Sequence, residues 1–349
     1  MPNPFFYGGP ITEPQKFFGR KREFRVIFGR LSTTPPQSVS VVGERRIGRT
    51  SLLYHLTQVY SQWLTDAERY LFAYVDLQSA RCHTRAGLLA KMLEALLQQA
   101  RLDRRSDDGQ WLTDLRERIS EGEAIDLPCF GEALERIKAL GYRSVICLDE
   151  FEKLTARPQE FGDDLLDSWR NMAQFGHIAF ITASKVPLEL LSRTGRLTSP
   201  FFNIFAQVPL GELELDEARE LITQPSDRPF TEEEVRLALR LAGCHPFRLQ
   251  IACSLIYEEK ARGRVDQRQV RKAYQMMVKP LLPSQPSWAM KQILQPRMIP
   301  LISILAAIAA LVGIFSVIVR NPVGVVIAAV MAALVLLLSL AIELSRRVP

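Results

Sequence analysis

The chain has 349 residues, a formal net charge of +6 and 47% hydrophobic residues. This length gives a prior of about two domains. The basic residues are scattered rather than gathered into one block, so the charge does not indicate a nucleic-acid-binding surface and reflects mainly solubility or attraction to an inner leaflet. No two cysteines have C-x-x-C spacing, a pattern typical of reduced structural cysteines in a cytosolic domain. The cysteines are Cys82, Cys129, Cys147, Cys244 and Cys253.

The N-terminal segment, residues 1–37, has no charged stretch followed by an apolar core and a small-residue cleavage site, so we expect no cleaved signal peptide. A short β-branched run at 38–42 then predicts a buried strand. Residues 43–50 read Gly-Glu-Arg-Arg-Ile-Gly-Arg-Thr, which fits the phosphate-binding pattern G-x-x-x-x-G-K-[ST] except that Arg49 replaces lysine. Apolar residues with helical spacing follow at 51–56.

A strand, a glycine turn and a helix in this order predict a phosphate-binding loop. Gly43 and Gly48 let backbone N–H groups converge on a phosphate, which the positive end of the following helix also attracts. Thr50 would supply a hydroxyl to Mg²⁺. The alternative is a strand-to-helix turn that binds no ligand. The predicted nucleotide-binding residues of this segment are Gly43, Arg45, Arg46, Ile47, Gly48, Arg49, Thr50 and Ser51.

Arg49 decides between hydrolysis and simple binding of a nucleotide. Arginine is a bulkier, planar fork, whereas lysine is a compact charge, but both neutralise phosphate oxygens. We therefore expect binding to survive and the geometry of transfer to change, since a misplacement of about 1 Å can cost on the order of 100-fold in rate. Arg45 and Arg46 would crowd the phosphates, assist them or point to solvent. Slow hydrolysis is favoured over none.

Strands and helices alternate further along the chain, which predicts an α/β fold with a mostly parallel sheet covered by helices on both faces. The polar stretch 102–128, with a weakly amphipathic piece at 111–119, is expected to lie outside the sheet. The expected strands are 38–42, 70–76, 143–149, 178–182 and 203–208, and the expected helices between them are 85–101 and 130–140.

The strand at 143–149 ends in two acids, Asp149 and Glu150. Its apolar residues place Asp149 at the carboxyl edge of a buried strand, where ligands of open α/β sheets bind. Asp149 is expected to hold Mg²⁺ and Glu150 to polarise the attacking water as general base. The alternative is a strand that ends in a solvated acidic turn.

Residues 38–211 are predicted to form the phosphate-loop core and residues 212–280 a helical domain, called the lid below, with helices beginning near Asp216, Thr231 and Pro246. A proline-containing stretch, 281–298, reads as an extended linker.

Two uncharged runs, 299–319 and 323–342, lie within the last segment, 299–345. Each run is long enough at 1.5 Å per residue to cross a hydrocarbon core of about 30 Å. Asn321-Pro322 between them predicts a transmembrane helical hairpin, and the basic residues at its outer ends place both termini in the cytoplasm, at the inner membrane.

The chain resembles the signal-transducing ATPases with numerous domains (STAND), within the broader AAA+ group of P-loop NTPases, and especially their archaeal-type and cyanobacterial-type branch. The resemblance spans about residues 14–280 and leaves out the hairpin. It rests on Phe18-Gly-Arg20 with Glu23, the phosphate loop (Walker A), Val75-Asp-Leu77, Leu148-Asp-Glu-Phe151 (Walker B), Ile181-Thr-Ala-Ser184, Ser199–Phe205, Gly211–Ala218 and Gly243–Gln250.

The resemblance implies further roles for individual residues. Phe18, Gly19 and Arg20 would belong to the pocket for the nucleotide base. Ser184 matches a polar sensor of the γ-phosphate, with a simple strand-end hydroxyl as the alternative. His245-Pro246 matches a lid motif that contacts the nucleotide, with an ordinary helix-starting loop as the alternative.

We therefore interpret the chain as a membrane-anchored nucleotide switch that binds ATP and Mg²⁺. Its hairpin would be an anchor or an effector, and a homo-oligomer would form on activation, with an unknown sensor or effector partner. Two alternatives remain: a nucleotide-binding scaffold without turnover, and a DNA-associated ATPase. Against the latter, little room is left for a winged helix before the hairpin, so a nucleic-acid partner is not expected. Defence or cell-death signalling follows only by family analogy.

Overall fold

The computed structural model describes residues 3–195, 197–263 and 265–279. The predicted linker at 281–298 and the predicted hairpin at 299–345 lie outside the described residues. Within the described part of the chain, no helix has both the length and the apolar character needed to span a bilayer.

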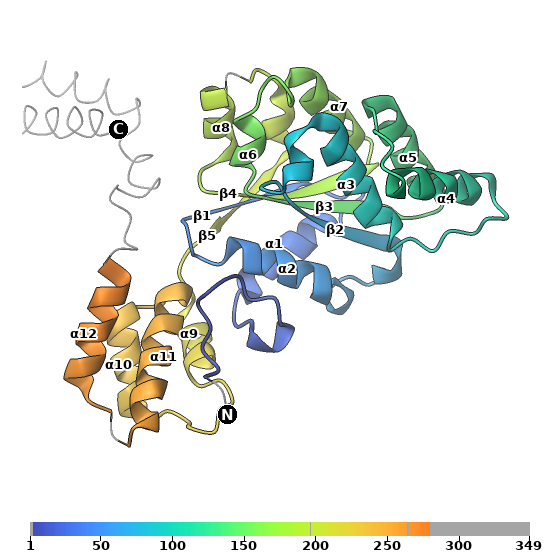
Figure 1. Cartoon of the computed structure of the whole chain (residues 1–349). Helices are drawn as coiled ribbons and strands as arrows, with labels where there is room; N and C mark the ends of the chain where they lie inside the picture. Colours follow the sequence, from blue (N-terminus) through green and yellow to red (C-terminus); the bar gives the residue numbers. More distant parts are fainter. Residues whose placement is uncertain (1–2, 196, 264, 280–349) are drawn as a thin grey trace, which may run out of the picture. The chain divides into compact units, whose positions relative to one another are not determined.

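A parallel sheet forms the centre of the described unit (Figure 1). Its strand order is β2-β3-β4-β1-β5, so that β4 lies between the strand before the phosphate loop and the strand that ends in the two acids. The prediction of a parallel α/β sheet is confirmed. The strands are β1 (Val39–Gly43), β2 (Tyr70–Asp76), β3 (Arg143–Asp149), β4 (Ile178–Ser184) and β5 (Ala206–Leu210).

Helices cover both faces of the sheet, as Figure 1 shows: α1 and α2 lie on one face and α3, α5 and α7 on the other. Buried apolar residues of the two sides form two separate clusters with the strands between them. The helices of the sheet region are α1 (Lys21–Leu31), α2 (Arg49–Val59), α3 (Arg85–Leu97), α4 (Asp107–Ser120), α5 (Leu127–Ala139), α6 (Glu152–Thr155), α7 (Asp163–Gln174) and α8 (Leu188–Gly195).

Several elements differ from the sequence predictions. The helix expected at 85–101 ends at Leu97, and the fifth strand begins at Ala206 because Pro200–Ile204 forms a 3₁₀ turn. The weakly amphipathic piece in the polar stretch belongs to a full helix, α4, whose buried Leu112, Leu115 and Ile119 join the cluster of α3 and α5. Helices α1 and α7 were not predicted. The remaining 3₁₀ turns are Pro14–Lys16, Tyr60–Gln62, Ala67–Arg69 and Ala80–His83.

The described residues between β5 and residue 279 form helices but no strand, as expected. They are α9 (Leu215–Ile222), α10 (Glu232–Ala242), α11 (Pro246–Ala261) and α12 (Gln267–Val278). Thr231 caps α10 through a capping box with Glu234, and Pro246 occupies the first turn of α11, where its missing N–H costs nothing. These helices have an apolar cluster of their own, which also takes in Phe5 from the N-terminal segment.

Candidate nucleotide-binding site

The loop between β1 and α2 has the backbone that its glycines require. A Cβ on Gly43 would lie 2.7 Å from the Leu210 carbonyl oxygen, so no larger residue fits there. Gly48 has φ = +100°, a conformation open chiefly to glycine, and it precedes the first turn of α2. Arg46 also has positive φ, at 68°. The loop thus wraps tightly in front of the N-terminus of α2, the arrangement that turns N–H groups toward an anion.

Thr50 and Asp149, the predicted magnesium ligands, lie together. The buried Asp149 carboxylate is hydrogen-bonded to the Thr50 side chain. It also accepts hydrogen bonds from Tyr74 Oη (3.0 Å) and from the Glu150 N–H (2.9 Å). Burial raises the Asp149 pKa, while these hydrogen bonds and the charge of Arg49 oppose the rise.

The donor set suits a nucleotide-bound Mg²⁺ rather than a metal held by protein alone. Among the described residues, no three His, Cys, Asp or Glu side chains are placed to bind a metal. Mg²⁺ is commonly bound through one or two protein oxygens together with substrate phosphates and water. Thr50 and Asp149 provide two such oxygens at the mouth of a phosphate loop, so the residues present fit this group.

Arg49 does not point into open solvent but pairs with Glu150. Its Nη2 lies 2.9 Å from Glu150 Oε1, and the arginine is only 6% exposed. Its Nη1 is buried and has no hydrogen-bond partner within the described residues. An unpaired buried donor of this kind is costly, and a phosphate oxygen is the partner that a guanidinium fits best. The site therefore suits a phosphate group.

Lys185 is the second cation on Glu150. Its Nζ lies 3.1 Å from Glu150 Oε2 and 2.9 Å from Glu152 Oε1. Burial alone would raise the Glu150 pKa, but the hydrogen bond from Lys185 and the charges of Arg49 and Lys185 outweigh it and lower the pKa. Glu150 also has φ = +52°, a strained conformation for a residue with a side chain. Glu150 is thus held as an ionised carboxylate between two cations.

Ser184 ends β4, between the two motifs, in register with Val42 of β1. Its buried hydroxyl donates to the Val186 carbonyl oxygen at 2.7 Å. This bond holds the hydroxyl at the end of the strand, and the role of Ser184 as a phosphate sensor stays a prediction.

The segment 18–20 contacts the phosphate loop, helix α1 and helix α9. Arg20 is buried, and its guanidinium donates to the Ile47 carbonyl oxygen of the phosphate loop (2.9 Å) and to Glu23 Oε1 (3.2 Å). Gly19 has φ = +78°, and a Cβ there would meet Glu217 of α9 at 2.8 Å. Arg20 therefore supports the loop from behind, and Gly19 permits close packing on the lid.

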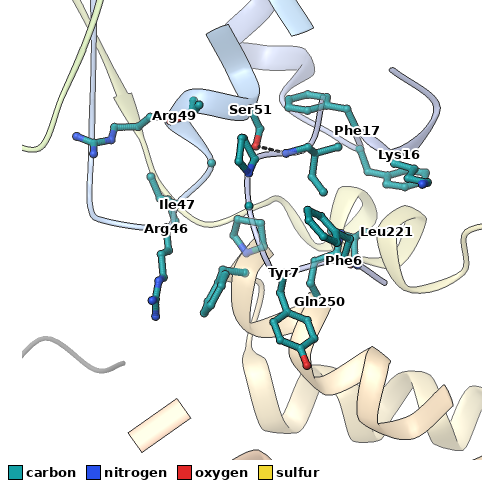
Figure 2. Close-up of a pocket in the computed structure, with 18 of the residues that line it drawn as sticks. Phe6, Tyr7, Lys16, Phe17, Arg46, Ile47, Arg49, Ser51, Leu221 and Gln250 are labelled. Carbon is teal, nitrogen blue, oxygen red and sulfur yellow. Dashed lines mark hydrogen bonds between the residues drawn. The ribbon is translucent and has the colours of Figure 1, made fainter. Parts of the chain in front are cut away.

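A cavity of about 260 Å³ lies in front of the phosphate loop (Figure 2). One side is formed by the loop and the other by the N-terminal segment and the lid. The predicted site residues in its wall are Phe18, Arg20, Arg45, Arg46, Ile47, Gly48, Arg49, Thr50, Ser51, Glu150 and Pro246. Those outside its wall are Gly19, Gly43, Asp149, Ser184 and His245.

Residues 3–13 form a strap that joins α2 to α11 beside this cavity. At one end, the Asn3 amide donates to Ser254 Oγ at 2.8 Å. At the other end, the Ile11 N–H donates to Ser51 Oγ at 2.9 Å, and Figure 2 shows this bond. The strap was not predicted, because its contacts join residues 40 or more positions apart and follow no periodic pattern.

The lid approaches the loop through the start of α11. The Arg46 guanidinium lies over the Phe247 ring, 4.6 Å from its centre, and Tyr7 of the strap meets the same ring edge-on. Arg46 therefore contacts the lid, whereas the sequence analysis expected it to lie near the phosphates or to point to solvent. Pro246 lines the cavity beside Phe247.

His245 caps α11 from a buried position, and its Nδ1 has no partner within the described residues. Burial, together with the charges of Arg248 and Arg20, lowers its pKa from 6.5 to about 4. Charging this imidazole is therefore unfavourable in the folded protein.

We expect the stability of the protein to fall as the pH drops from about 6.5 toward 4. In this window the unfolded chain binds a proton on His245 that the folded chain excludes, so the free energy of unfolding decreases by about 2 kcal/mol between pH 7 and pH 5. Denaturant unfolding of the wild type and of His245→Gln at both pH values would measure it. An equal pH dependence in the two proteins would contradict this assignment.

Comparison with known proteins agrees with this geometry. The model of the family described as novel STAND NTPase 2 matches residues 33–267, more than half of the chain. A search of curated proteins finds no match. Among solved structures, a Walker-type ATPase of Pyrococcus abyssi is similar, with TM-score 0.58 and 20% identity over 88% of this chain and 83% of that one. The ORC2 protein of Aeropyrum pernix, solved in ADPNP-ADP complexes, gives TM-score 0.52 and 16% identity over 78% and 71%.

The fold and the loop define a P-loop nucleotide-binding NTPase of the α/β class. The chain belongs to the novel STAND NTPase 2 family. The two structural likenesses, at these identities, show the fold alone. The predicted resemblance to STAND ATPases is confirmed for the P-loop domain.

Sequence reasoning missed several residues of the site: Tyr74, Lys185, Phe247, Gln250 and the strap. Lys185 directly follows the predicted sensor Ser184, and a charged residue at the end of a buried strand next to the acids was the available signal. Tyr74 lies on β2, two residues before Asp76, and so projects from the same face of the strand. Nothing in the sequence marks the partner of either residue.

Proposed function

We propose that the protein binds ATP with Mg²⁺ and hydrolyses it slowly. The observation that carries this proposal is the cluster of Thr50, Asp149, Arg49 and Glu150 at the mouth of a phosphate loop, in or beside the wall of one cavity. The complete set of loop, magnesium oxygens and candidate base supports hydrolysis, and the pairing of Glu150 with two cations supports a low rate.

The residues of the site have separate roles in binding and hydrolysis. The loop N–H groups and Arg49 bind and orient the phosphates, and Thr50 and Asp149 would hold Mg²⁺, which on binding neutralises charge on the phosphate oxygens. Glu150 orients the attacking water and accepts its proton. Its low pKa keeps it ionised but makes it a weak base, and Arg49 must share its charge between Glu150 and the phosphates. Both features favour long occupancy over rapid turnover.

We further propose that the protein works as a membrane-anchored signalling switch at the cytoplasmic face of the inner membrane and assembles into a homo-oligomer when activated. The uncharged runs at 299–319 and 323–342 support the anchor. Family membership supports the switch. The contacts of Arg46 and the strap with α11 connect the phosphate loop to the lid, as a switch requires.

The test is equilibrium binding and phosphate release by the full-length chain, with ATP in the presence and absence of Mg²⁺. Thr50→Ala should weaken Mg²⁺-ATP binding by at least about 10-fold, because a magnesium oxygen is lost, and should leave binding without Mg²⁺ nearly unchanged. Thr57→Ala, the same change further along α2, serves as the matched control, since Thr57 Oγ1 donates to the Tyr54 carbonyl oxygen and lies outside the cavity wall. Absence of ATP binding by the wild type would overturn the proposal.

A scaffold that holds ATP without turnover is the second candidate, favoured by the Arg49–Glu150 pair. It predicts ATP binding with no phosphate release above background. A DNA-associated ATPase would instead show DNA affinity that falls steeply with added salt, which the same protein preparation can test.

A further inference from the structure

Gln250 lies on α11 at the side of the cavity away from the loop (Figure 2). Its side chain is 6% exposed and lines the cavity. Its Oε1 accepts the Phe6 N–H of the strap at 3.1 Å, which fixes the orientation of the amide. Because the amide is planar, engagement of its oxygen also fixes the direction of its NH₂ group, which points away from the Phe6 N–H.

The Nε2 group of Gln250 has no hydrogen-bond partner among the described residues. The same cavity wall contains apolar and aromatic side chains, contributed by Phe6, Phe18, Leu213 and Leu221. An apolar slot with one fixed donor fits a planar heteroaromatic ring, which offers π-faces to the walls and a lone pair to the donor. The phosphate loop, on the other side of the cavity, would bind the phosphates, so the side with Gln250 would bind the nucleobase.

We propose that Gln250 is the residue that reads the nucleobase, donating a hydrogen bond from Nε2 to a ring acceptor, and that it selects adenine over guanine. This inference rests on the proposed function as an ATP-binding protein. Both purines offer ring acceptors and one exocyclic NH₂ group, but guanine also carries the N1–H donor, so it needs one more acceptor from the protein than adenine does.

The charges in the cavity wall supply the discrimination. Among the described residues of the wall, the sole carboxylate is Glu150, which is engaged by Arg49 and Lys185 on the loop side. The buried guanidinium of Arg20 is likewise committed, to Ile47 and Glu23. Guanine would therefore bury one donor more than adenine, with no side-chain carboxylate free to receive it, and a buried donor left unpaired weakens binding.

Gln250→Glu tests the inference directly, because it keeps an oxygen for the Phe6 N–H and replaces the donor with an acceptor. We expect ATP affinity of the full-length chain to fall about 10-fold or more and the preference for ATP over GTP to fall about 10- to 100-fold. Gln269→Glu is the control: it makes the same change at an exposed position of α12, outside the cavity wall, and should leave the ATP/GTP ratio unchanged.

A second measurement needs no stable Gln250 variant. Binding of 1-deaza-, 3-deaza- and 7-deaza-ATP to the wild type should show one analogue weakened about 10-fold relative to ATP, the one that lacks the acceptor. Gln250→Met should bind that analogue and ATP equally. Two results would overturn this inference alone. In one, Gln250→Glu binds ATP tightly with an unchanged ATP/GTP ratio. In the other, the wild type binds ATP tightly and binds all three analogues as well as ATP. Failure of the wild type to bind any nucleoside triphosphate overturns the proposed function as well.

Discussion

Glu150→Gln should lower the rate of ATP hydrolysis by about 100-fold or more, the usual contribution of a general base. The amide is isosteric with the carboxylate but cannot accept the proton of the attacking water. The affinity for ATP should rise, because Arg49 loses the charged partner that competes with the phosphates. Phosphate release and equilibrium binding, measured on the same full-length protein, check both parts.

Glu152→Gln is the matched control for this substitution. Like Glu150, Glu152 pairs with Lys185, at 2.9 Å. The partner of Arg49, however, is Glu150. Its replacement should leave the hydrolysis rate within about 3-fold of wild type, since no base is lost. If Glu150→Gln and wild type released phosphate equally, the protein would be the scaffold without turnover.

Arg49→Lys should raise the rate of hydrolysis, by up to about 100-fold if the arginine misplaces the phosphates by about 1 Å. Lysine restores the compact charge that the loop pattern specifies and has no planar fork to hold Glu150. ATP affinity should stay within a few-fold, because the positive charge remains. Single-turnover kinetics separate the chemical step from product release.

Arg49→Ala gives the complementary result. Loss of a charge-assisted hydrogen bond to phosphate, worth about 1.5–3 kcal/mol, should weaken ATP binding about 10- to 100-fold. Glu150 then keeps Lys185 as its cation. Replacement of the neighbouring Arg45, which also lines the cavity but is exposed, is the matched control and should have a smaller effect. An unchanged rate in Arg49→Lys would mean that the arginine does not limit turnover.

Local patterns identified the elements of this fold where burial is continuous. Strands β2 and β3 begin and end at the predicted residues, because a strand buried on both faces of a parallel sheet is an uninterrupted apolar run bounded by polar residues. The glycine spacing at 43–50 likewise sufficed for the loop, since only glycine fits at Gly43 and Gly48. Helix α1 was not predicted, although its buried residues Phe24, Ile27, Phe28 and Leu31 have helical spacing.

The sequence by itself determined the class of this protein: an α/β nucleotide-binding fold with a phosphate loop, paired acids and a helical lid, each fixed by residues close together in the chain. Only the tertiary structure decided which groups meet. Arg49 and Glu150 pair across 101 positions, and Gln250 meets the strap across 244. Such contacts depend on strand order and on where the lid folds back, and a pattern within one segment carries neither. Arg49, which in the sequence reads as a phosphate ligand alone, is thus also the counter-ion of the candidate base.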